Sequence, residues 1–111
     1  MAHYRISVYV PESHAQQVKS ALFSEGAGRI GDYDSCCWQT SGNGQFRPLE
    51  GSQPYIGQTG QVERVDELKI ELVCEAQYLR KALEAMIEAH PYEEPAYDVY
   101  QALSLMDVLA P

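Results

Sequence analysis

The chain has 111 residues, 8 of them basic and 16 acidic, which gives a formal net charge of -8. This charge repels nucleic-acid backbones and anionic lipid surfaces, so we expect neither nucleic acid nor a membrane as a partner. No apolar run approaches the roughly 20 residues that span a bilayer, and the first residues do not resemble a secretory signal. Three cysteines fit a reducing compartment better than a disulfide framework, so we expect a cytoplasmic protein.

The first part of the chain predicts a strand followed by a helix. Apolar and polar side chains alternate over residues 3–10, as a half-buried strand requires. Pro11 suits the first turn of a helix, because that turn leaves the amide of its first residues unpaired. Apolar residues then recur at helical spacing until Gly26, namely Ala15, Val18 and Leu22.

The second part of the chain predicts two strands, a helix and a final strand. Residues 29–39 and 61–74 are the two expected strands, and the latter alternates clearly. A helix with one apolar stripe follows and ends at Pro91. Residues 96–103 form the last expected strand, and residues 104–111 are a short apolar tail.

This order predicts an α+β, ferredoxin-like βαββαβ domain that comprises residues 1–111. In this fold, two helices cover one face of a four-stranded antiparallel sheet and leave the other face bare. The side chains expected on that face include Tyr9, either Trp38 or Cys36, and Val73, which are in part too apolar for full exposure to water. We therefore expect self-association, to which the tail would contribute.

Several motifs resemble the domain inserted in the middle of bacterial YqfO proteins. They are G-x-G-R-I-G-D-Y-x-x-C at Gly26 to Cys36, G-x-G-x-F-x-P at Gly42 to Pro48, P-Y-I-G at Pro54 to Gly57, and H-P-Y-E-E-P-A-Y-D at His90 to Asp98. That domain is similar to the PII signal-transduction and CutA divalent-cation-tolerance proteins. The resemblance implies a ferredoxin-like fold and an oligomer, with a trimer favoured.

The same resemblance argues against an enzyme. In YqfO-type proteins the dinuclear metal site lies on flanking domains, which this sequence does not contain. We therefore expect a free-standing, non-enzymatic PII/CutA-like sensor or binding module for a small molecule, a metal ion or a protein partner. The alternatives are a structural adaptor that docks on a larger enzyme and a CutA-like binder of divalent cations.

A long loop at about residues 42–60 is the first candidate site, because unstructured connections of this length are usually functional or disordered. Arg47 can hold a carboxylate or phosphate in a two-pronged contact, and Gln45 and Tyr55 add polar groups. Tyr33, in the preceding expected strand, completes the set of candidate ligand-binding residues. The loop's interleaved apolar residues favour the alternative that it packs as a hairpin extension or clasps a neighbouring subunit.

His90 and Glu93 are the candidate metal ligands. An imidazole and a carboxylate at this spacing suit a divalent cation, although no cofactor is certain. The alternative is a helix stop followed by a turn that enters the last strand.

The segment GAGRIG at residues 26–31 matches the dinucleotide-binding pattern G-x-G-x-x-G. In a dinucleotide site this pattern follows a strand and opens a helix, whereas here it leaves a helix and enters an expected strand. A helix end carries partial negative charge, the wrong sign for pyrophosphate. We therefore predict a structural turn at this segment.

Overall fold

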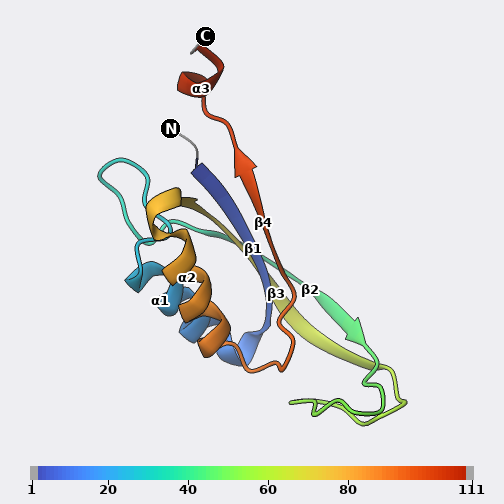
Figure 1. The fold of residues 1–111 in the computed structure, drawn as a ribbon. Helices are drawn as coiled ribbons and strands as arrows, with labels where there is room; N and C mark the ends of the chain where they lie inside the picture. The colour runs from blue at the N-terminus through green and yellow to red at the C-terminus, as the bar shows by residue number, and fades with distance from the viewer. Residues whose placement is uncertain (1–2, 110–111) are drawn as a thin grey trace.

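A computed structural model describes residues 3–109 of the chain (Figure 1). The elements follow in the order β1 (His3–Pro11), a 3-10 turn (Glu12–His14), α1 (Ala15–Ser24), β2 (Trp38–Phe46), β3 (Glu63–Glu75), α2 (Ala76–Ala89), β4 (Tyr97–Ala102) and α3 (Leu105–Leu109). Residues 1, 2, 110 and 111, which belong to the predicted domain and tail, lie outside the described residues.

The strands form one antiparallel sheet in the order β2-β3-β1-β4. Both long helices, α1 and α2, cover the same face of this sheet (Figure 1). The predicted α+β, ferredoxin-like fold is therefore confirmed. The register places Ile6 of β1 between Leu72 of β3 and Val99 of β4, so the helix-facing side chains of the central strands meet in one layer.

The core lies between this layer and the two helices. The predicted alternation holds where the helices cover the sheet, because every second residue is buried over residues 6–10 of β1 and 68–74 of β3. The buried apolar residues are Ile6, Val8, Val10, Ala15, Val18, Leu22, Ala27, Leu68, Ile70, Leu72, Cys74, Ala82 and Met86.

The position of β2 differs from the prediction. We expected a strand over residues 29–39, but β2 is Trp38–Phe46, and of residues 29–37 only Ile30 and Tyr33 form an isolated bridge. Because Gly42–Phe46 belong to the strand, the connection to β3 covers residues 47–62 rather than 42–60. The strand was missed because this edge strand is glycine-rich and polar on both faces, and it forms by pairing with the long β3.

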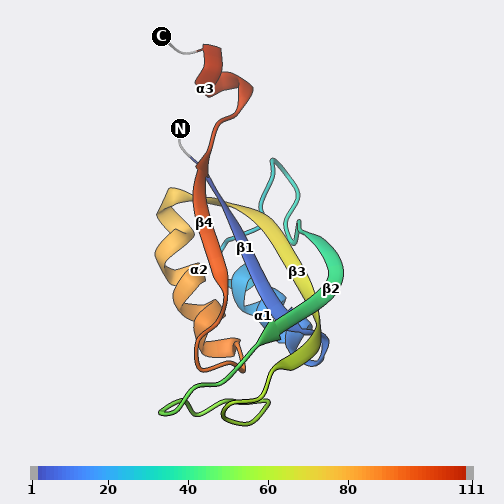
Figure 2. The ribbon, with the colours of Figure 1, turned by 90° about the vertical axis from the view of Figure 1, so that its right-hand side faces the viewer.

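The face of the sheet opposite the helices is uncovered in the single chain (Figure 2). Trp38 is 68% exposed and Tyr100 is 48% exposed on this face. Charged residues lie between them, and Lys69 and Glu71 form an ion pair at 3.7 Å. The face therefore combines exposed aromatic side chains with paired charges.

The C-terminal segment projects away from the sheet and carries its own helix cap (Figure 1). The backbone amide and the hydroxyl of Ser104 both donate to Asp107 Oδ2, at 2.8 and 3.0 Å, and these hydrogen bonds contribute to lowering the pKa of Asp107. The apolar side chains of α3 are exposed, namely Leu105, Met106, Val108 and Leu109. Within residues 3–109, no helix is long and apolar enough to cross a membrane.

The GAGRIG segment forms the structural turn predicted for it. Gly26 ends α1 with a φ of 100°, and the amide of Ala27 donates back to the carbonyl of Leu22. Gly28, with a φ of 79°, donates its amide to the Val73 carbonyl at 2.8 Å, while its own carbonyl accepts from the amide of Cys36. Gly28 therefore joins the end of α1 to β3 through its backbone.

We predict that Gly28→Ala destabilises the protein by about 3 kcal/mol, because a Cβ adds strain at positive φ and lies 2.8 Å from the Cys36 carbonyl oxygen. Gly31→Ala is the matched control. It also has positive φ but has open space around its Cβ, so it should cost only about 1 kcal/mol. Urea denaturation of both variants measures the difference, and equal losses would show that the backbone contact is unimportant.

Candidate functional site

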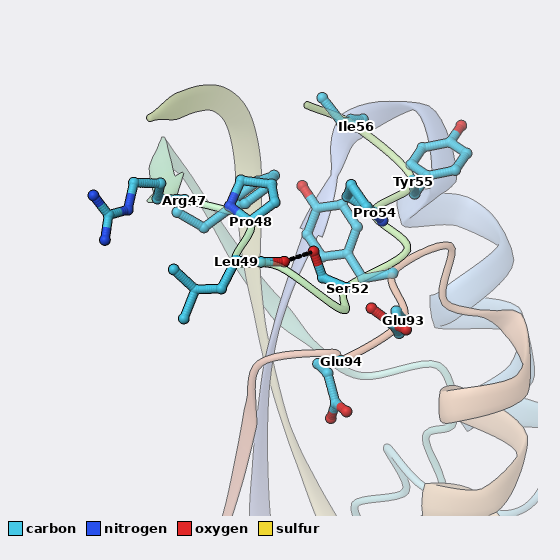
Figure 3. A pocket seen from close by; sticks show the side chains of 11 residues that line it. Arg47, Pro48, Leu49, Ser52, Pro54, Tyr55, Ile56, Glu93 and Glu94 are labelled. Atoms are coloured by element: carbon cyan, nitrogen blue, oxygen red, sulfur yellow. Dashed lines mark hydrogen bonds between the residues drawn. The ribbon is translucent and has the colours of Figure 1, made fainter. Parts of the chain in front are cut away.

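A hollow of about 330 Å³ lies where the β2–β3 connection approaches the α2–β4 connection (Figure 3). Its walls are mostly apolar and aromatic, with two carboxylates at one side. The lining residues are Phe46, Arg47, Pro48, Leu49, Ser52, Pro54, Tyr55, Ile56, Tyr92, Glu93 and Glu94. The hollow therefore joins two segments that are distant in the sequence.

Tyr92 is the centre of an aromatic cluster beside this hollow. Its ring centroid lies 5.8 Å from that of Phe46, 6.4 Å from that of Tyr55 and 5.1 Å from that of His90. Tyr55 in turn meets His14 edge to face at 5.6 Å. Such pairs add modest stability beyond the area they bury, so the cluster fixes one wall of the hollow.

The hydroxyl of Tyr92 donates to Glu67 Oε2 at 2.8 Å. Glu67 belongs to β3 and is only 9% exposed, so its carboxylate depends on such partners. Burial and the adjacent carboxylate both raise the pKa of Tyr92. Tyr92 therefore holds its proton and acts as a hydrogen-bond donor.

Gly44 provides the space for this arrangement. A Cβ at Gly44 would overlap the Glu67 carboxylate, whereas a Cβ at Gly42, on the same strand and face, would meet open space. Gly44, the second glycine of the G-x-G-x-F segment, thus allows the Glu67 carboxylate to lie over β2 and to reach the Tyr92 hydroxyl.

Both nitrogens of His90 are engaged. Nε2 donates to the carbonyl of Tyr9 at 2.7 Å, and Nδ1 accepts the amide of Tyr92 at 3.1 Å. The imidazole is therefore the neutral Nε2–H tautomer, which ties the end of α2 to β1 and orients Tyr92. Burial lowers the pKa of His90, against the opposing effects of the Tyr9 carbonyl and of the Glu67 carboxylate.

Hydrogen bonds also hold the β2–β3 connection in place. The amide of Gln53 donates to Glu93 Oε1 at 3.0 Å, and the hydroxyl of Ser52 donates to the Leu49 carbonyl at 2.6 Å (Figure 3). The amide of Gly60 donates to the carbonyl of the buried Pro48 at 2.8 Å. The connection is thus anchored to itself and to the segment after α2.

The charged groups around the hollow lie on different sides. Glu93 and Glu94 come from the α2–β4 connection, and the Arg47 guanidinium points away from both of them (Figure 3). Within residues 3–109, neither Arg47 nor Glu94 makes a hydrogen bond or an ion pair. The side of the hollow formed by residues 93 and 94 is therefore acidic.

A second, more polar hollow of about 490 Å³ lies on the uncovered face of the sheet. It is lined by Tyr9, Thr40, Ser41, Gly42, Asn43, Gly44, Glu67, Lys69 and Glu71. Glu67 lines this polar hollow and accepts the hydrogen bond from Tyr92, which lines the apolar hollow, so this hydrogen bond connects the two hollows.

The structure brings together some of the candidate ligand-binding residues. Arg47 and Tyr55 both line the apolar hollow. Gln45 lies in β2 opposite Arg64 and does not line it. Tyr33 is 74% exposed in the connection between α1 and β2, at the opposite end of the sheet (Figure 1).

Two important residues of the site, Phe46 and Tyr92, were not predicted. Phe46 ends the glycine-rich strand, and Tyr92 lies within the H-P-Y-E-E-P segment. The signal for Tyr92 was its position two residues after a helix-ending histidine, where the chain must turn back toward the sheet.

The hydrogen bonds of His90 and Glu93 compete with the metal binding predicted for these two residues. His90 has no unused nitrogen, so a metal ion there would displace the Tyr9 carbonyl or the Tyr92 amide. Glu93 already holds the amide of Gln53. Among residues 3–109, no group of three or more histidine, cysteine or acidic side chains is placed to hold a metal ion.

The chain is similar to part of several longer proteins. It is 48% identical over 97 residues to a GTP cyclohydrolase 1 type 2 homolog of Halalkalibacterium halodurans, covering 87% of this chain and 26% of that protein. The corresponding Bacillus subtilis protein is 44% identical over 96 residues, with 86% of this chain and 26% of that protein covered. The chain thus spans about a quarter of the length of these curated relatives, and no family model matches it.

Solved structures show the same fold. A Bacillus cereus protein related to NIF3 superposes with a TM-score of 0.78 at 44% identity, over 91% of this chain and 26% of that one. CutA from Xylella fastidiosa has a TM-score of 0.68 at 20% identity, over 96% of this chain and 90% of its own. GlnK of B. subtilis has a TM-score of 0.60 at 13% identity, over 92% and 86% of the two chains.

We predict that Gly44→Ala lowers stability by about 2 kcal/mol, because the Cβ forces the Glu67 carboxylate away from the Tyr92 hydroxyl. Gly42→Ala, the matched control, should leave stability unchanged or raise it slightly. Urea denaturation gives both values. In a Tyr92→Phe background the cost of Gly44→Ala should shrink, and an unchanged cost would mean that the hydrogen bond is not its cause.

We predict that stability falls as the pH drops below about 6.5, because the unfolded chain then binds a proton that buried His90 resists. A protonated ring would also lose its acceptor for the Tyr92 amide. Urea denaturation between pH 5.5 and 8 should therefore show a smaller pH dependence in His90→Gln than in the unchanged protein. His3→Gln is the control, since the side chain of His3 has no hydrogen bond within residues 3–109. An identical slope in His90→Gln and the unchanged protein would refute the assignment.

Proposed function

We propose that this chain is a non-enzymatic, oligomeric PII/CutA-like module that binds a small molecule or a protein partner. The uncovered sheet face, with Trp38 and Tyr100 exposed on it, is the observation that carries the oligomer. The exposed apolar side chains of α3 add a second surface that self-association would remove from water. A trimer is the assembly that we favour.

The hydrogen bonds of His90 and Tyr92 support a structural rather than a catalytic role for these two residues. A general acid or base needs a group that can exchange its proton with a substrate. His90 uses both of its nitrogens for backbone groups, and Tyr92 keeps its proton for Glu67. These groups therefore serve to build the walls, while the apolar lining and the aromatic rings offer a surface for a ligand.

We further propose that the module corresponds to the inserted domain of YqfO-type proteins, with a cytoplasmic location. The similarity to a segment that makes up about a quarter of the GTP cyclohydrolase 1 type 2 homologs supports this correspondence. The same observation favours a second candidate function, that of an adaptor which docks on a larger enzyme and contributes no ligand site.

The assembly is tested by size-exclusion chromatography with light scattering at high micromolar concentration. We predict a mass of about three times the 12.4 kDa of one chain. Trp38→Lys should shift the protein toward the monomer, because it places a charge on the uncovered face. Ile87→Lys, on the exposed side of α2, is the control and should keep the assembly.

A chain that stays monomeric under these conditions would refute the oligomer. The binding and adaptor functions are separated by thermal shift with nucleotides, divalent ions and small organic molecules. A ligand at 100 times its dissociation constant adds about 2.7 kcal/mol of stability, which a thermal shift detects. The absence of any shift would favour the adaptor.

A further inference from the structure

We propose that the apolar hollow binds a small amphiphilic amine, a molecule with an apolar or aromatic body and one cationic head. This inference rests on the proposed binding function and specifies the class of ligand. It follows from the size of the hollow, from the nature of its walls and from the side on which its charges lie.

The walls select an apolar body. The hollow, at about 330 Å³, is of a size that takes a small organic molecule. Prolines, aliphatic side chains and aromatic rings form most of its surface, and the aromatic cluster around Tyr92 holds one wall rigid. A preformed apolar surface gains free energy by excluding water, and it loses little entropy when the ligand binds.

The charges select a cationic head. Glu93 and Glu94 lie together on one side of the hollow, and Glu94 has no ionic partner within residues 3–109. The one cationic lining residue, Arg47, points away from them (Figure 3). An ammonium group on this side of the hollow gains charge complementarity with the Glu94 carboxylate, and Glu93 adds to the negative charge there.

The same arrangement disfavours anions. On the side formed by residues 93 and 94, a carboxylate or phosphate would face two acidic residues within a chain whose net charge is already -8, and Arg47 points away from that side. This side of the hollow therefore favours a cationic head group over an anionic one.

Three molecules with one hydrocarbon body test this proposal, namely 4-phenylbutylamine, 4-phenylbutanol and 4-phenylbutanoate. Titrations are followed by NMR of the full chain at low ionic strength, through the signals of Tyr55 and Tyr92. We expect the amine to bind about fivefold more tightly than the alcohol, and the carboxylate to bind most weakly. Equal affinities, or tighter binding of the carboxylate, would overturn the proposal.

Glu94→Gln should weaken binding of the amine about threefold and leave binding of the alcohol unchanged. The matched control is Asp32→Asn, which removes one negative charge from the exposed connection at the other end of the sheet. Asp32→Asn should leave the affinity for the alcohol unchanged, and it should weaken the amine only by the small effect of one lost net charge. An equal effect of the two variants would show that only the net charge matters, and would refute a specific contact with Glu94.

The outcomes separate this inference from the function on which it rests. If the chain assembles but none of the three molecules moves the tyrosine signals, the ligand class is wrong and the oligomer stands. A lysine-containing peptide is included as a fourth probe. If it binds while 4-phenylbutylamine does not, the cationic group comes from a protein partner and the small-molecule proposal is refuted.

Discussion

The hydrogen bonds of Tyr92 are the constraint on which the rest of the site depends. Its hydroxyl reaches Glu67 of β3, and its amide reaches His90, whose other nitrogen holds the carbonyl of Tyr9 in β1. Three elements are therefore joined through one residue that follows a helix. A buried carboxylate and a buried imidazole are each costly without partners, and here the same tyrosine supplies a partner to both.

This constraint explains how a long connection becomes ordered. The β2–β3 connection has little secondary structure, so fixing its backbone costs considerable conformational entropy. The ring of Tyr92 gives Tyr55 and Phe46 a surface on which to pack, and Glu93 accepts the amide of Gln53. The hollow exists because two connections stabilise each other, and neither would form that wall alone.

The sequence predicted the parts of the fold that hydrophobic periodicity controls. The helix stripes, β1 and the core half of β3 followed directly from their buried apolar residues. The position of β2 was wrong, because an exposed edge strand containing Gly42 and Gly44 has no such period and is fixed by its partner. Arg47 and Tyr55 were found through the loop, whereas Tyr92 acts through a contact with Glu67 that no local pattern predicts.

Glu67 makes the two faces of the site interdependent. Its carboxylate lines the polar hollow on the uncovered face and also holds the hydroxyl that fixes the wall of the apolar hollow. A group that packs on the uncovered face and draws this carboxylate away would deprive Tyr92 of its acceptor, and the reverse holds for a ligand that moves Tyr92. Because Gly44 leaves room for this carboxylate, the glycine-rich strand that we expected to be a loop links the uncovered face of the sheet to the apolar hollow.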